Sequence, residues 1–165
     1  MSELRTNKIY PRDGLPAGAS GGGIIQIVEG ALTTGNVNGT LFSTTSSTYV
    51  DVFSVTITPT SASNKILVNM AIGPYGGNVD TLRMNGQILR DSTQVWYTRN
   101  LYFRSGGDFK AVQTAAVVLD SPATTSAVTY KFQVKVETAA GGSTAEFYAD
   151  NSNYNNKMIL MEVSG

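Results

Sequence analysis

Alternation of apolar and polar residues over residues 127–138 is the feature that most constrains the fold of this chain. An extended strand places every second side chain on the same side, whereas a helix would scatter these residues around its axis. We therefore expect a β-strand with one buried and one solvated face, which needs a second apolar layer to pack against. The side chains expected in the core are Val128, Tyr130, Phe132, Val134 and Val136.

The same period of two recurs along the chain. Residues 49–58 and 65–72 alternate on either side of a polar turn at 60–64, and shorter strands are expected at 24–28, 95–104, 144–149 and 157–163. Residues 110–119 fit a helical stripe as well as a strand, and the β-branched pair Val117 and Val118 favours a strand. Asn85-Gly86, between two alternating runs, predicts a type I′ hairpin turn, in which both residues take positive φ.

Eight to ten short strands separated by turn signals predict an all-β fold. The best architecture is an antiparallel β-sandwich of the jelly-roll type over residues 24–165. A length of 165 residues suits one such domain. The abundance of 17 Gly and 46 Ser, Thr and Asn residues agrees with strands and tight turns rather than helices.

Residues 1–23 differ from the rest and predict an extended amino-terminal arm. They contain prolines and a run of glycines, and they show no apolar period. Spaced apolar residues suit a peptide that lies on a partner's surface, although an unattached terminus with a glycine linker has the same composition. The expected anchors are Leu4, Ile9, Tyr10, Pro11, Leu15 and Pro16.

The chain has no histidine and no cysteine, which removes disulfides, thiol nucleophiles and Ser-His-Asp arrangements. Its 12 acidic residues are spread singly, without a clustered pair. Two carboxylates could still meet in space, as in glycosidases, and a hydrolase is therefore kept as the last hypothesis. We predict no catalytic residues, no metal site and no cofactor.

The charge balance limits the partners. A formal net charge of zero gives no basic surface for phosphate backbones, so we expect no nucleic acid. No apolar run approaches the roughly 20 residues that cross a bilayer, so we expect no membrane insertion.

One segment combines aromatic and basic side chains suited to recognition. Tyrosine and tryptophan offer flat surfaces with a polar edge, and arginine offers forked donors for sugar hydroxyls or acidic glycans. Core packing of the aromatic residues is the favoured alternative. The possible receptor-binding residues, including two from an Asn-rich loop, are Trp96, Tyr97, Arg99, Tyr102, Arg104, Asn153 and Tyr154.

The last strand, residues 157–163, is apolar on both faces. It is either the centre of a sheet covered on both sides or a contact with a neighbouring subunit near a symmetry axis. In the second case Met158, Leu160 and Met161 would form a trimer interface.

Several stretches carry a family resemblance: SELRTNKI and PRDGLP in the arm, GGGIIQIVEG after it, then SSTYVDVFSVTITPTSASNKILV, LDSPATTSAVTYKFQVKVET and MILMEVSG. In these the chain resembles small structural proteins of tailed bacteriophages, particularly marine ones. The resemblance implies a homotrimer on the virion surface, with heads similar to the C1q and tumour-necrosis-factor fold and an arm docked on phage capsid or tail proteins. The chain lacks a long shaft, which favours a short fibre or a decoration protein.

The leading hypothesis is therefore a non-enzymatic, trimeric virion protein anchored by its arm and able to contact a host-surface glycan. A second hypothesis is a capsid-stabilising cement protein with no receptor role. A third is a free carbohydrate-binding module or a ligand similar to tumour necrosis factor.

Overall fold

A computed structural model describes residues 23–32, 40–76, 81–105, 114–139, 145–148 and 156–165. Within these ranges the chain forms β-strands and no helix. The strands are β1 (Ile24–Ala31), β2 (Thr40–Thr44), β3 (Val50–Ile57), β4 (Lys65–Ile72), β5 (Pro74–Gly76), β6 (Thr81–Arg90), β7 (Thr93–Ser105), β8 (Thr114–Asp120), β9 (Val128–Ala139), β10 (Ala145–Tyr148) and β11 (Lys157–Val163).

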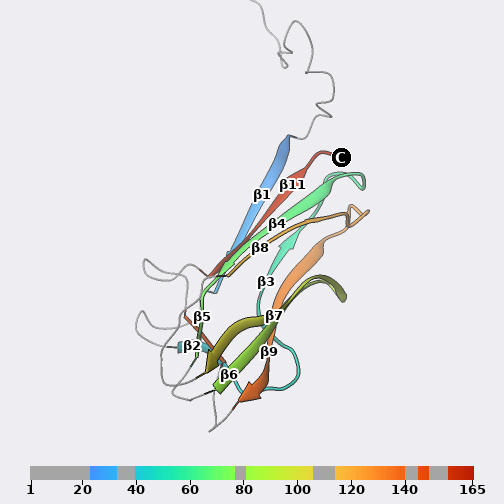
Figure 1. Cartoon of the computed structure of the whole chain (residues 1–165). Helices are drawn as coiled ribbons and strands as arrows, with labels where there is room; N and C mark the ends of the chain where they lie inside the picture. Colours follow the sequence, from blue (N-terminus) through green and yellow to red (C-terminus); the bar gives the residue numbers. More distant parts are fainter. Residues whose placement is uncertain (1–22, 33–39, 77–80, 106–113, 140–144, 149–155) are drawn as a thin grey trace, which may run out of the picture.

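Eight of these strands build two four-stranded sheets with the orders β1-β11-β4-β8 and β3-β9-β6-β7. All of the pairings are antiparallel. The chain passes repeatedly from one sheet to the other, and strands from its two ends pair with each other, β1 with β11 and β3 with β9, while β6 and β7 form a hairpin (Figure 1). This interleaving of two Greek keys is a jelly roll, which confirms the predicted all-β sandwich.

The core lies between the two sheets and is built by the alternation that the sequence shows. Ile66, Val68, Met70 and Ile72 of β4 are fully buried. They face the inward side chains of β9, all of which are 5% exposed or less. The predicted inward residues of 127–138 and 65–72 are therefore confirmed.

A third, three-stranded sheet of order β2-β10-β5 raises the number of strands above the eight to ten expected. It is fixed to the sandwich by aromatic side chains. Phe147 of β10 contacts Phe132 of β9 edge to face, with ring centroids 6.0 Å apart, and Phe42 of β2 packs on Phe147 at the same distance. The short strands β2 and β5 have too few alternating residues to be recognised from sequence.

The predicted hairpin turn at Asn85-Gly86 is wrong. Both residues lie inside β6, which continues to Arg90. A β-bulge in the pairing with β7 brings Leu101 into the core above Gly86. A Cβ at Gly86 would lie 3.1 Å from Leu101 and 3.2 Å from Phe132, so this glycine allows close packing and does not turn the chain.

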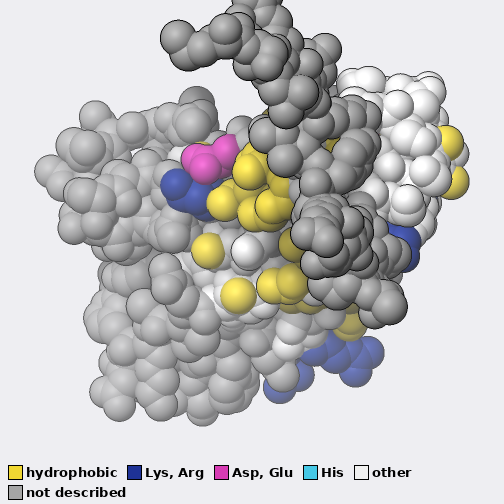
Figure 2. Space-filling view, turned by 90° about the horizontal axis from the view of Figure 1, so that it is seen from above, with side chains coloured by type: hydrophobic (Ala, Val, Ile, Leu, Met, Phe, Trp, Pro, Cys, Tyr) yellow, Lys and Arg dark blue, Asp and Glu magenta, His cyan; other side chains and the backbone are white. Residues whose placement is uncertain are grey.

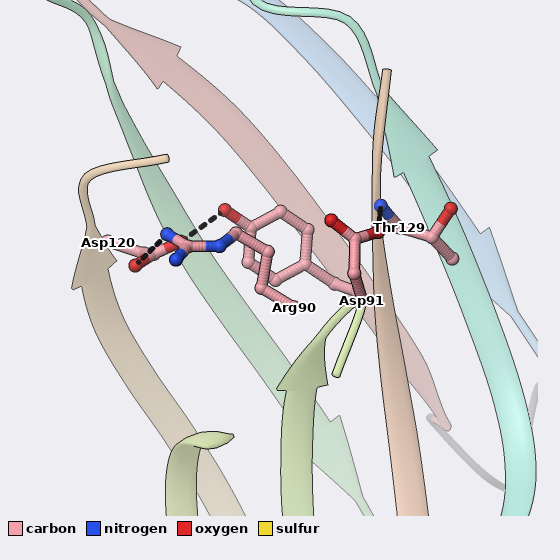
Figure 3. A network of polar contacts seen from close by, with 5 residues as sticks. Arg90, Asp91, Asp120 and Thr129 are labelled. Carbon is pink, nitrogen blue, oxygen red and sulfur yellow. Dashed lines mark hydrogen bonds and ion pairs between the residues drawn. The ribbon is translucent and has the colours of Figure 1, made fainter. Parts of the chain in front are cut away.

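The turn between β6 and β7 falls at Asp91 instead. Asp91 has a left-handed φ of 52°, which an aspartate tolerates better than most residues. Its amide donates to the Thr129 carbonyl at 2.7 Å, and its carboxylate accepts from the Thr129 amide at 3.0 Å (Figure 3). These two bonds hold the β6–β7 turn against the start of β9.

A polar cluster ties the two sheets together next to this turn. Asp120, at the end of β8, accepts hydrogen bonds from Arg90 at 2.8 and 2.9 Å and from the Tyr130 hydroxyl at 2.7 Å (Figure 3). Arg90 and Tyr130 belong to one sheet and Asp120 to the other. Burial, together with the bond to Asp120, raises the pKa of Tyr130, so the phenol stays protonated and keeps donating.

We expect Asp120→Ala to lower the free energy of unfolding by about 2 to 3 kcal/mol, because it leaves the buried Tyr130 hydroxyl without its acceptor and Arg90 without its partner. Urea unfolding measures the change. Glu137→Ala is the control, since the Arg83–Glu137 pair spans 3.8 Å between side chains 42% and 36% exposed. Its loss should cost less than about 1 kcal/mol. Equal losses in the two variants would contradict an inter-sheet role for Asp120.

Candidate functional site

The outer surface of the β1-β11-β4-β8 sheet is unusually apolar. Five large aliphatic side chains on its two edge strands are 45% to 65% exposed: Ile24, Ile25, Ile27, Val117 and Leu119. The central strands β11 and β4 add half-buried side chains between them, namely Ile159, Met161, Val163 and Leu67. We call these nine side chains the apolar face.

The register explains how residues so distant in sequence form one surface. Ile27 pairs with Met161, Met161 with Leu67, and Leu67 with Leu119, so one apolar row crosses all four strands. In the view of Figure 2, hydrophobic side chains gather in the middle of the molecule, with a basic and an acidic group beside them.

Charged side chains on this side are few: the pair Lys157 and Glu29, and Lys65, which is exposed and lies opposite Val163 in the pairing of β4 with β11. Lys157 lies 3.4 Å from Glu29, so the ion pair brings no net charge to the apolar face. Four strands spaced about 4.8 Å apart and seven residues of about 3.3 Å each give a footprint of roughly 450 Å². This area also includes the outward side chains of Glu29, Lys65 and Asn69, so the apolar part is smaller, of the size at which exposed apolar patches are often functional.

The predicted interface residues divide between the two sides of β11. Met158 and Leu160 are fully buried in the core of their own chain and have no surface to offer a neighbour. Met161 points to the apolar face, where it is partly exposed. Sequence reasoning missed Ile27, Val117 and Leu119, although the run of β-branched residues in 110–119 was a signal that both sides of that strand are apolar.

The outer surface of the β3-β9-β6-β7 sheet has the opposite character. Tyr97, Gln87, Gln133 and Asp51 lie in register across its four strands. Gln87 donates to Gln133 at 2.7 Å, and Gln133 donates to Asp51 at 2.5 Å. The result is a hydrogen-bonded polar row that ends at an exposed aromatic ring, because Tyr97 is 41% exposed.

A second group lies beside this row. Lys135 is placed over the ring of Tyr49, 5.3 Å from its centroid, and the Arg99 guanidinium donates to the Tyr97 hydroxyl at 3.1 Å. Burial of the Tyr49 hydroxyl, followed by the effect of Tyr97, raises the pKa of Tyr49 to about 12. Tyr97 and its hydrogen bond also raise the pKa of Arg99, which stays charged. We call Tyr49, Tyr97, Arg99, Lys135 and the polar row together the polar face.

The structure brings only part of the predicted receptor set to this surface. Tyr97 and Arg99 are exposed on it, whereas Trp96 pairs with Ile88 and packs against the core, as the alternative interpretation held. Tyr102 and Arg104 lie in β7, but their side chains are outside the described residues, as are Asn153, Tyr154 and the arm anchors. Sequence reasoning missed Tyr49, Gln87 and Gln133, which only the register places beside Tyr97.

Glu162 is the one fully buried carboxylate among the described residues. Its Oε1 accepts hydrogen bonds from Asn64 Nδ2 at 2.6 Å, from the Thr60 amide at 2.7 Å and from the Thr60 hydroxyl at 2.8 Å. Its Oε2 accepts from Gln26 at 2.5 Å. Burial alone would raise the pKa of Glu162, but the bonds from Asn64, Gln26 and Thr60 outweigh it and lower the pKa to about 2. Donors occupy both oxygens, which suits a structural role.

The described part of the chain holds no group of three or more Asp and Glu side chains placed to bind a metal ion. Within the same part, no helix is long and apolar enough to cross a membrane.

The topology and the two contrasting surfaces define a jelly-roll β-sandwich protein with an exposed apolar face. The chain matches no protein-family model and no curated protein. Among solved structures it is similar to the VP2 subviral particle of infectious bursal disease virus, with a TM-score of 0.51 and 12% identity over 85% of this chain and 33% of that one. At such an identity the likeness shows a shared fold.

Two further matches have lower TM-scores and add no argument. One is the structure of infectious bursal disease virus Gt strain, with a TM-score of 0.47, 13% identity, and coverage of 86% of this chain and 38% of that one. The other is the insecticidal delta-endotoxin Cry8Ea1 of Bacillus thuringiensis, with a TM-score of 0.38, 16% identity, and coverage of 74% and 19%. The chain spans about a third of the VP2 chain that it matches.

The lowered pKa of Glu162 predicts a specific acid sensitivity. Because its pKa is about 2 in the folded protein against an ordinary value of 4.5, the carboxylate stabilises the fold above pH 4.5, and this contribution disappears as the pH falls towards 2. At pH 7 the Glu162→Gln variant should have a lower free energy of unfolding than the wild type. Between pH 4.5 and pH 2 its free energy of unfolding should fall less steeply with pH than that of the wild type, as measured by urea unfolding. Glu29→Gln, on the surface, should keep the wild-type slope. A wild-type slope in Glu162→Gln would contradict the assignment.

Proposed function

We propose that this protein is a non-enzymatic structural component of a tailed-bacteriophage virion. In this proposal it stands on the particle surface as a homotrimer, as a short fibre or a decoration protein. The arm, residues 1–23, attaches it to capsid or tail proteins through Leu4, Ile9, Tyr10, Pro11, Leu15 and Pro16. The jelly-roll fold shared with VP2 and the resemblance to phage structural proteins support this role.

The observation that carries the proposal is the apolar face. Exposing five large aliphatic side chains around four half-buried apolar ones costs solubility and is typical of a surface that is covered by another protein chain. A second copy of this chain is the occupant proposed here. The face brings little net charge, since Lys157 and Glu29 neutralise each other and Lys65 is the exposed basic residue next to Val163, so identical copies can meet there with little repulsion.

The size of the face suggests that more than one element takes part in assembly. A footprint of roughly 450 Å² is smaller than the about 800 Å² that each partner buries in a typical stable interface. In this proposal the arm supplies the additional contacts. The Ser164 amide donates to the Gly23 carbonyl at 3.1 Å, which fixes the point where residues 1–22 join the edge strand β1. Twenty-two extended residues span at most about 75 Å, enough to reach a neighbouring protein.

A capsid-stabilising cement protein without a receptor role is the second candidate. The apolar face favours it equally, because a cement protein also needs to bury surface against its neighbours. A free monomeric carbohydrate-binding module would need the polar face alone and would leave the apolar face unexplained, whereas a trimeric signalling ligand would need both and is distinguished by binding its receptor as isolated protein.

The proposed role of the apolar face as a subunit interface can be tested by introducing a charged side chain into it. We expect Leu119→Lys and Val117→Lys each to convert the purified full-length trimer to monomer, because a lysine in the contact would be desolvated without a partner. Light scattering after gel filtration measures the mass, and circular dichroism checks the fold. Gln94→Lys, on an exposed residue of β7 in the other sheet, should remain trimeric. A monomeric wild-type protein, or folded lysine variants that stay trimeric, would contradict the proposed interface.

The arm is tested by deletion. Removal of residues 1–20 should leave a folded trimer that is no longer incorporated into particles, measured by gel analysis of purified virions. Normal incorporation of the truncated protein would refute the anchoring role. If particles lacking the protein become sensitive to heat yet adsorb to the host normally, the cement function is favoured over a receptor-binding one.

A further inference from the structure

We propose that the polar face binds an acidic saccharide, a sugar chain that carries carboxylate groups. The proposal rests on the surface location inferred above and names a ligand class for it. It does not depend on the trimer or on the arm, because the polar face belongs to the sheet opposite the apolar face.

Aromatic surface is the first element of the proposed site. Tyr97 exposes its ring on a flat sheet, and its hydroxyl is oriented by the Arg99 guanidinium at 3.1 Å. Tyr49 supports this surface from below: its hydroxyl is buried and Lys135 lies over its ring, so Tyr97 is the ring that is open to a ligand. Sugar rings stack their C–H faces on such aromatic surfaces and use the phenol edge for hydrogen bonds.

The amide row is the second element. Gln87 and Gln133 join Tyr97 to Asp51 in one line across the sheet, and their mutual hydrogen bonds hold the amides in a fixed orientation. A primary amide has two donors and two acceptor positions, so these bonds leave capacity for a ligand. A line of preoriented donors and acceptors next to an aromatic ring matches the hydroxyl groups along an extended sugar chain.

Charge decides which saccharide fits. The outward side chains of this sheet include four basic groups, Arg83, Arg99, Lys131 and Lys135, against the two acidic groups Asp51 and Glu137. The chain as a whole is neutral, whereas these six side chains leave an excess of two positive charges on this surface. Arg99 is fully exposed and stays charged, and its forked donors suit a carboxylate. An excess of two positive charges is too small for a nucleic-acid site, where many phosphates must be neutralised.

The test uses the isolated full-length protein with trigalacturonic acid as the probe and its methyl ester as the uncharged control ligand. Titration calorimetry or chemical-shift titration measures the dissociation constant. We expect millimolar binding of the acid, at least tenfold weaker binding of the ester, and weakening at higher salt. Arg99→Ala and Tyr97→Ala should each reduce affinity at least tenfold. Lys65→Ala removes an equal charge at an exposed residue of the other sheet and should bind as the wild type does.

Three outcomes would overturn the proposal. They are no binding of trigalacturonic acid up to about 10 mM, equal binding of acid and ester, or unchanged affinity in folded Arg99→Ala and Tyr97→Ala proteins. A single-stranded oligonucleotide that binds more tightly than the saccharide would also overturn the proposal, because the polar face would then be a general polyanion site. None of these results bears on particle incorporation or on the trimer, so failure here is distinguishable from failure of the proposed function.

Discussion

Face-to-face packing of the two four-stranded sheets is the interaction on which the rest of the structure depends. Strand β9 contributes most clearly, because it lies between β3 and β6 and turns a continuous line of apolar side chains inward. Tyr130 is part of this line and also donates to Asp120 of the opposite sheet, so packing and the inter-sheet hydrogen bond reinforce each other at one residue. Once this core fixes the register, the outward residues of both sheets are determined as well.

On both outer surfaces the exposed side chains are those that alternate with the core residues along each strand, but the two surfaces differ in chemistry. In β9 the outward positions are polar, and the sheet presents amides, tyrosines and basic groups. In β11 and β8 the outward positions are also largely aliphatic, β4 adds Leu67 between them, and the sheet presents the apolar face. This division suits a protein that buries one side against copies of itself and turns the other towards solvent and ligands. The buried Glu162, saturated by hydrogen bonds, closes the end of the sandwich where β1 begins, without exposing a charge.

Much of the fold could be predicted from the sequence, because period-two alternation depends only on local geometry. It located the strands at 65–72 and 157–163 with the observed bounds. The Asn85-Gly86 error has a physical cause, since a turn signal and a close-packing glycine look alike until Leu101 and Phe132 are placed around it. Both surfaces depend on register between distant strands. Met161 beside Leu67, or Gln87 beside Gln133, could not be foreseen from spacing along the chain.

The central claim is that the apolar face is covered in the assembled protein while the polar face stays open. The chain contains no cysteine, so single cysteines can report on this directly. In the native oligomer, the thiol introduced by Val117→Cys should react with a maleimide at least tenfold more slowly than the one introduced by Gln94→Cys. Both should react equally fast after unfolding in urea. Equal labelling rates in the native, full-length protein would show that the apolar face is not covered and would contradict the account.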